Sequence, residues 1–177
     1  MGIIRRKIKS LLVVFFLLSL VMVFLSILFP SEVVTSKWIM IGAQKKEVLT
    51  KLNNIDDWAA WNDILIQQEN IQTYKKDSIL NKGDSITWGQ SQQALNIIRF
   101  DSIRVDGLDM DIQMGGDQPV HSGITFSVQK DSVLMSWYII EKLKWYPWEK
   151  IYGMMAADMK GPALQHSLSV FKEQLDN

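Results

Sequence analysis

Residues 105–141 read VDGLDMDIQMGGDQPVHSGITFSVQKDSVLMSWYIIE. Apolar and polar residues alternate along much of this stretch, which is the period-two pattern of half-buried strands. Turn-forming residues separate the alternating runs, as at Gly115-Gly116-Asp117 and Lys130-Asp131. Connections this short join antiparallel neighbours and leave no room for parallel crossovers. The stretch therefore predicts an antiparallel meander.

The same alternation reaches upstream to about Ile71, with further turn residues at Asn81-Lys82-Gly83-Asp84 and Asp106-Gly107. An earlier segment, VVTSKWIMI, is rich in β-branched and aromatic residues and also predicts a strand. The predicted strands are 33–41, 71–80, 84–90, 94–102, 105–114, 120–129 and 132–141. Because sheets of six or seven long strands rarely stay flat, we expect strong curvature.

Helical patterns flank the six consecutive strands. Residues 44–52 and 55–62 predict two short helices, and from Tyr152 to Leu175 apolar residues recur every three or four positions. Gly161-Pro162 interrupts this last pattern and predicts a kink. A curved antiparallel sheet must cover its concave face, so we expect the long helix to pack there. The predicted fold class is α+β.

Residues 11–29, LLVVFFLLSLVMVFLSILF, form an uncharged apolar run. As a helix the run is about 28 Å long, close to the hydrocarbon thickness of about 30 Å. Basic residues that flank a membrane helix stay on the cytoplasmic side. Four of them precede the run, namely Arg5, Arg6, Lys7 and Lys9.

The predicted organisation is therefore a cytoplasmic basic segment at 1–10, a single-pass transmembrane helix at 11–29 and an extracytoplasmic domain at 33–175. In a Gram-negative source the domain would be periplasmic. The alternative is a cleaved signal peptide. Against it, the apolar run exceeds the usual 7–15 residues, and no small-residue cleavage site follows.

Charge and composition exclude several classes of protein. Beyond the four N-terminal basic residues the chain carries 15 basic and 19 acidic residues, so this part is mildly acidic. It therefore has no electrostatic footprint for nucleic acid. The chain has no cysteine, which excludes disulfides, thiolate catalysis and zinc–sulfur sites. The oligomeric state is left open.

Three stretches carry a resemblance to a known family: IGAQKKEV at 41–48, IDDWAAWN at 55–62, and the closing helix from Trp148 to Leu175. Their order and spacing resemble the helix-grip (SRPBCC or START-like) superfamily, in particular its polyketide cyclase/dehydrase-like bacterial branch. One departure is Gln44, which stands where the family usually has proline. The resemblance implies an apolar cavity between sheet and long helix that binds lipids, sterols, polyketides or similar molecules, and catalysis in a minority of members.

The aromatic and methionine content suits such a cavity. The chain has seven tryptophans and nine methionines, and wide aromatic rings with pliable thioethers suit a site that holds an apolar ligand. The alternative for these residues is ordinary core packing. The candidate cavity-lining residues are Trp88, Phe100, Trp137, Tyr152, Met155 and Met159.

The segment KLKWYPW at 142–148 joins the last predicted strand to the long helix. Tryptophan and tyrosine beside lysine are typical of membrane–water interfaces. Trp145, Tyr146 and Trp148 are therefore candidates for a membrane-interface loop that collects a ligand from the bilayer. The alternative is a hydrophobic staple that fixes the entry angle of the helix.

Neither a metal site nor a cofactor site is predicted. The acidic stretch around Asp109 and Asp111 fails the EF-hand pattern, because Met114 stands where its glycine belongs and Val120 where its glutamate belongs. A solvated acidic face is the favoured interpretation. His121 and His166 are far apart in the sequence, with no metal-binding helix motif.

Catalytic motifs for serine hydrolysis, phosphate binding and dinucleotide binding are absent from the sequence. A cavity enzyme needs only a lone acid or base, such as Glu141, Asp101 or His121, and nothing selects one. Three functions stay open: a membrane-tethered domain that binds a hydrophobic small molecule or lipid, a cyclase- or dehydratase-like enzyme, and a protein-interaction or stress accessory module without ligand. An enzyme is the less favoured of the first two.

Overall fold

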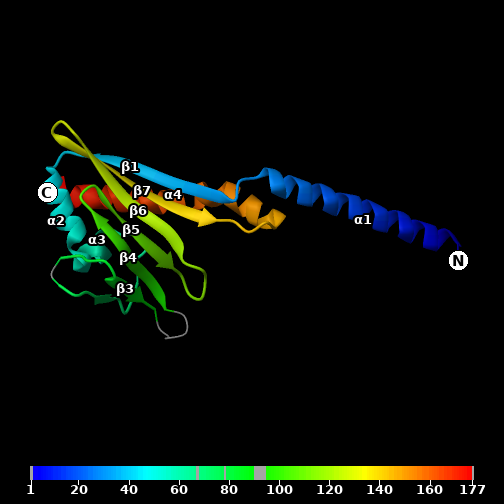
Figure 1. Cartoon of the computed structure of the whole chain (residues 1–177), viewed down its shortest axis with the longest axis horizontal. Helices are drawn as coiled ribbons and strands as arrows, with labels where there is room; N and C mark the ends of the chain where they lie inside the picture. The colour runs from blue at the N-terminus through cyan, green and yellow to red at the C-terminus, as the bar shows by residue number, and fades with distance from the viewer. Residues whose placement is uncertain (1, 67, 78, 90–94, 177) are drawn as a thin grey trace. The chain divides into compact units, whose positions relative to one another are not determined.

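The computed structural model describes residues 2–66, 68–77, 79–89 and 95–176. The chain has four α-helices and one short 3-10 helix among these residues, in an α+β fold (Figure 1). The helical elements are α1 (Gly2–Leu28), α2 (Lys45–Asn53), η1 (Ile55–Asp57), α3 (Trp58–Trp61) and α4 (Pro147–Asp176). The strands are β1 (Glu32–Ile41), β2 (Gln72–Tyr74), β3 (Ser85–Trp88), β4 (Asn96–Arg104), β5 (Gly107–Gln113), β6 (Val120–Gln129) and β7 (Ser132–Lys142).

The strands form one seven-stranded sheet in the order β1-β7-β6-β5-β4-β3-β2. Each neighbouring pair from β2 to β7 is antiparallel, which confirms the predicted meander. The tight turn between β6 and β7 places Lys130 at φ +53°, and the turn after β5 places Gly115 at φ +58°. Glycine reaches that region without the steric cost that a side chain adds.

The register gives the sheet one apolar face and one polar face. On the apolar face Ile98 lies opposite Ile112 and Phe100 lies opposite Met110, and all four side chains are buried. The register then shifts between Phe100 and Ser102, so that Asp101 is an extra residue in β4. Such a β-bulge re-aims side chains locally.

The C-terminal part of α4 supplies the other half of the core, as expected for a helix-grip fold. Leu164, Leu168 and Phe171 are buried against the apolar face of the sheet. The helix runs through Pro162 without a break. At Gly161 an added Cβ would lie 2.8 Å from Lys37 Cε of β1, so glycine allows close packing there.

One predicted boundary is wrong. Among the described residues, the strand predicted at 71–80 covers Gln72–Tyr74, and the buried carboxylate of Asp84 holds part of the chain that follows as a loop. It accepts hydrogen bonds from the backbone N–H of Lys76 at 3.2 Å and of Asn81 at 2.8 Å. The long helix begins at Pro147, one residue before the closing helix expected from Trp148, and proline is well suited to a first helical position.

The chain divides into two compact units, Met1–Val33 with Lys142–Met155 and Val34–Glu141 with Ala156–Asn177. The first, which we call the N-terminal unit, contains α1, the KLKWYPW segment and the first turns of α4. The second, the grip unit, contains most of the sheet, α2, α3 and the rest of α4. Among the described residues, Lys7–Leu28 of α1 is long and apolar enough to cross a membrane by length and composition, with a mean hydropathy of 3.1.

Candidate functional site

An aromatic cluster occupies the core of the grip unit. Trp58 and Trp61 come from α3, and their ring centroids lie 4.8 Å apart. Phe100 of β4 packs edge-on against Trp58 at 4.8 Å. Trp61 contacts Trp137 of β7 at 5.8 Å and Phe171 of α4 at 4.9 Å, both edge-on. These five fully buried rings link helix α3, the sheet and helix α4.

The indole N–H groups of this cluster differ in whether they have a hydrogen-bond acceptor. Trp58 Nε1–H donates to the carbonyl oxygen of Leu52 at 2.9 Å, and Trp137 Nε1–H donates to Ser122 Oγ at 2.9 Å. Trp61 Nε1 is buried and has no hydrogen-bond partner among the described residues. An orphaned buried donor costs about 1–3 kcal/mol. Packing of the Trp61 ring must therefore offset that cost.

The six candidate cavity-lining residues fall into two groups. Trp88, Phe100 and Trp137 are buried in the core of the grip unit. Tyr152, Met155 and Met159 lie on the first half of α4 with exposed fractions of 38%, 55% and 59%. A role of either group in lining a cavity stays a prediction.

The candidate interface loop lies in the N-terminal unit. Trp145 and Trp148 are 65% and 67% exposed, and the Tyr146 ring stacks on Trp148 with centroids 5.0 Å apart and an interplanar angle of 16°. Residues of this loop and of α1 border an apolar groove of about 430 Å³. The groove is lined by Leu18, Ser19, Met22, Val23, Trp145, Pro147, Trp148 and Ile151.

Polar contacts tie α1 to the start of α4 within this unit. Ser26 Oγ donates to the carbonyl oxygen of Trp145. The backbone N–H of Leu143 donates to the carbonyl oxygen of Ser31 at 2.8 Å. The buried Lys150 donates its Nζ to the carbonyl oxygen of Pro30 at 3.0 Å. These bonds supply partners for the carbonyl groups of Pro30 and Ser31, just after α1, and of Trp145, just before α4.

Gly153 explains how closely these segments approach. A Cβ at this position would lie 2.2 Å from Leu143 Cδ1 and 3.1 Å from Val33 Cγ2. Any larger residue must displace both side chains. The helix start, the KLKWYPW segment and the chain after α1 therefore pack as one body.

A buried acid lies at the end of β7 in the grip unit. Glu141 is almost fully buried, and its Oε1 accepts from Lys160 Nζ of α4 at 2.5 Å. Its other oxygen, Oε2, is buried without a partner among the described residues. A carboxylate oxygen that is desolvated and uncompensated is costly, and such groups concentrate at functional sites.

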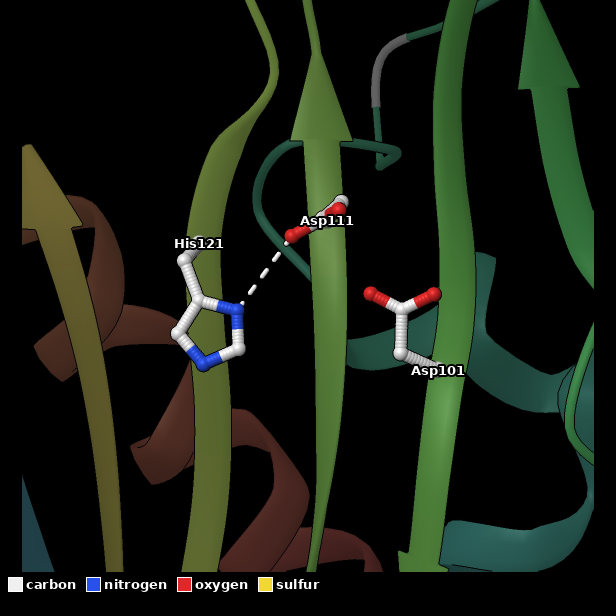
Figure 2. A group of neighbouring side chains, drawn as sticks. All are labelled: Asp101, Asp111 and His121. Atoms are coloured by element: carbon white, nitrogen blue, oxygen red, sulfur yellow. Dashed lines mark hydrogen bonds and ion pairs between the residues drawn. The ribbon is translucent and has the colours of Figure 1, made fainter.

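The polar face of the sheet carries a second group of ionisable side chains. Asp101 of β4, Asp111 of β5 and His121 of β6 each offer one ligand atom, and these atoms lie within 4.8 Å of one another (Figure 2). His121 Nδ1 and Asp111 Oδ1 are 3.2 Å apart. Partial burial and the neighbouring Asp111 carboxylate raise the pKa of Asp101 above its ordinary value.

A hydrogen-bonded network lies beside this group on the same face. Tyr138 O–H donates to Asp109 Oδ1 at 2.9 Å, and Arg104 forms an ion pair with the same carboxylate. Gly123 makes room for the tyrosine, since a Cβ there would lie 2.4 Å from Tyr138 Oη. Burial and the Asp109 hydrogen bond raise the pKa of Tyr138.

A surface groove of about 930 Å³ runs along α2 in the grip unit. Lys45, Lys46 and Lys75 line it together with Leu49 and other apolar side chains. Lys75 is already paired with an acid, Asp56, whose pKa is lowered chiefly by this hydrogen bond. Lysines on an open surface are common, so the groove offers little selectivity for an anion.

Sequence reasoning named Asp101 and His121 separately and assigned Asp111 to a solvated face. The structure brings the three together because they stand ten residues apart on consecutive meander strands. The equal spacing of these three residues over two successive hairpins is the sequence feature that could have identified them as a group. The bulge at Asp101, which completes the group, has no evident signature in the sequence.

Comparison with known proteins supports the fold. No protein-family profile matches the chain, and no curated protein matches it. Among solved structures, a START superfamily protein from Mycobacterium smegmatis aligns with a TM-score of 0.58 and 14% identity over 81% of this chain and 97% of its own. Truncated norcoclaurine synthase from Thalictrum flavum aligns with a TM-score of 0.58 and 13% identity over 82% and 95%.

A third similar structure is DynU16, a protein from the dynemicin biosynthetic locus, with a TM-score of 0.57 and 13% identity over 81% of this chain. The chain spans 47% of the length of DynU16. Identities this low establish the fold and leave the function open. The architecture of the chain is that of the helix-grip fold, and its structural neighbours include START-superfamily proteins.

Proposed function

We propose that this protein is a membrane-tethered domain that binds a hydrophobic small molecule or lipid. Helix α1 crosses the membrane with the basic N-terminus in the cytoplasm, and the helix-grip domain lies on the other side. The observation that carries the proposal is the apolar surface of the N-terminal unit. Its exposed side chains include Trp145, Trp148, Ile151, Tyr152, Met154 and Met155.

This surface is costly in water and favourable in a bilayer. Contiguous exposed apolar patches on soluble proteins mark sites for a partner, ligand or membrane. The packing around Gly153 and the Lys150–Pro30 hydrogen bond hold the surface beside the C-terminal end of α1, where a membrane span meets the interface. Tryptophan and tyrosine are the residues enriched at that depth.

The binding energy would come from removing apolar surface from water, at about 25 cal/mol per Å². The groove bordered by α1 and the KLKWYPW segment is apolar along most of its lining, which suits an acyl chain or another flexible apolar group. The helix-grip fold that the chain shares with the START superfamily protein is compatible with this proposal.

Lipid uptake tests the proposal. The full chain, held in nanodiscs, is mixed with vesicles that contain a fluorescent phospholipid, and the rate of label transfer is measured. Replacing both Trp145 and Trp148 with alanine should slow uptake roughly thirtyfold, because each indole contributes on the order of 1 kcal/mol when it enters the interface.

The matched control is Trp38→Ala, which removes an equally exposed tryptophan from β1 in the grip unit. It should leave uptake unchanged. Equal uptake by wild type and the double variant, with an unchanged circular dichroism spectrum, would contradict a membrane-collecting role for the loop.

A second candidate function is a cyclase- or dehydratase-like enzyme, and Glu141 is the observation that favours it. The buried Glu141 and the partly exposed Lys160 place a carboxylate and an ammonium group side by side, and Glu141 Oε2 has no hydrogen-bond partner among the described residues. Mass spectrometry of apolar extracts from membranes that hold wild type or Glu141→Gln distinguishes the two functions. An enzyme predicts a compound that only the wild type converts, and identical extracts would argue against one.

A further inference from the structure

We propose that Asp101, Asp111 and His121 form a binding site for a divalent transition-metal ion of the zinc type on the polar face of the sheet (Figure 2). The site lies in the grip unit and does not depend on the proposed lipid binding. It uses three adjacent strands of one meander, β4, β5 and β6.

The sheet register positions the three side chains. Asp111 lies directly opposite His121 in the β5–β6 pair. In the β4–β5 pair, the bulge between Phe100 and Ser102 makes Asp101 the extra residue. Figure 2 shows the Asp101 carboxylate and the His121 ring approaching Asp111 from opposite sides. Hydrogen bonds between the three strands fix the backbone positions of these residues. Little backbone rearrangement is therefore needed to bring the ligand atoms together.

The ligand set selects the class of metal. Calcium takes 6–8 oxygen ligands, and these three residues offer one imidazole and two carboxylates. Zinc accepts both kinds of ligand and often binds three protein groups plus a water. Two ligands about 2.0–2.2 Å from a tetrahedral ion lie about 3.3–3.6 Å apart. The 3.2 Å separation of His121 Nδ1 and Asp111 Oδ1 is close to that spacing, and the Asp101 ligand atom lies within 4.8 Å of both.

The charge balance also favours a cation. Two carboxylates lie side by side, and in the described part of the chain no lysine or arginine forms an ion pair with either of them. Arg99 lies opposite Asp111 in the register and is exposed, so its charge competes weakly with a metal. The three protein ligands would leave a coordination position for water or for an oxygen of a second molecule.

The protein contains its own control for this site. His166 Nδ1 and Asp63 Oδ1 lie 2.9 Å apart on the surface of the grip unit, as a histidine–aspartate pair. The pair does not belong to any group of three metal-ligating side chains among the described residues. It should bind a divalent ion much more weakly than the three-residue site.

The experiment is a zinc titration of the full chain in detergent after removal of metal with a chelator. Isothermal titration calorimetry should show one zinc ion bound with a micromolar or tighter dissociation constant. Asp111→Asn and His121→Gln should each weaken binding at least tenfold, since each removes one of three ligands. His166→Gln should leave the constant unchanged, and Arg99→Gln should tighten it.

Cobalt(II) gives a second, spectroscopic readout of the same site. Added to the wild type, it should produce visible absorption bands that zinc displaces and that are absent from His121→Gln. Absence of saturable zinc binding by the wild type would overturn the proposal. Equal affinity in wild type, Asp111→Asn and His121→Gln would also overturn it, because zinc would then bind elsewhere.

Discussion

Replacing Trp61 with alanine tests whether the interior of the grip unit is a packed core. The indole is fully buried and contacts three other aromatic rings, those of Trp58, Trp137 and Phe171. A tryptophan buries about 150–250 Å², worth about 4–6 kcal/mol at 25 cal/mol per Å². Removal also relieves the orphaned Nε1–H, which recovers about 1–3 kcal/mol.

The difference is a loss of about 1–5 kcal/mol of unfolding free energy, to which the cavity left behind adds, and tryptophan-to-alanine changes in cores typically cost about 3–5 kcal/mol. For a domain of this size that lowers Tm by about 10–15 °C. The assay is thermal unfolding of the full chain in detergent, followed by near-ultraviolet circular dichroism. Trp38→Ala, an exposed tryptophan, should change stability by less than about 0.5 kcal/mol. A loss below about 1 kcal/mol for Trp61→Ala would refute the packed core and indicate that the ring borders a large cavity.

Three further predictions concern the polar face and the N-terminal unit. Asp101→Asn in the presence of a chelator should raise the unfolding free energy at pH 7 by about 0.2–1 kcal/mol, since it removes the repulsion between Asp101 and Asp111. This gain in stability should vanish below about pH 4, where the Asp101 carboxyl of the wild type also becomes neutral. Tyr138 has a raised pKa, so its stabilising contribution is present below its ordinary value of 10.0 and is lost as the pH rises through the raised pKa. Denaturant unfolding above pH 10 should therefore show a steeper loss of stability in wild type than in Tyr138→Phe, and parallel curves would contradict this. Gly153→Leu should increase proteolysis after α1, because the side chain cannot fit without displacing its neighbours; an unchanged cleavage rate would argue against close packing there.

The sheet was predictable because its strands and turns depend on residues that are close together in the sequence. Alternation of apolar and polar residues, with turn chemistry at Gly115 and Lys130, determines which side chains face the core and where strands reverse. The loop at 75–77 and 79–84 was not predictable from alternation. It depends on the buried Asp84 carboxylate, which accepts backbone hydrogen bonds from residues up to eight positions away.

The candidate sites show the same division. The KLKWYPW segment could be singled out because interface-seeking residues are adjacent in sequence, whereas its attachment to α1 depends on Gly153 and Lys150, which show no motif. The three ligands of the proposed metal site are distant in sequence, and the bulge at Asp101 follows from how two strands pair. From its residue type alone, Asp111 was expected to lie on a solvated face.

Native mass spectrometry of the full chain, released from its own membranes in a mild detergent, tests the central proposal most directly. We expect an adduct of a fixed mass that matches a lipid or another apolar molecule. The adduct should be depleted in the Trp145→Ala, Trp148→Ala double variant and retained in Trp38→Ala. A spectrum that contains only the bare chain, from protein that still unfolds cooperatively, would contradict the account.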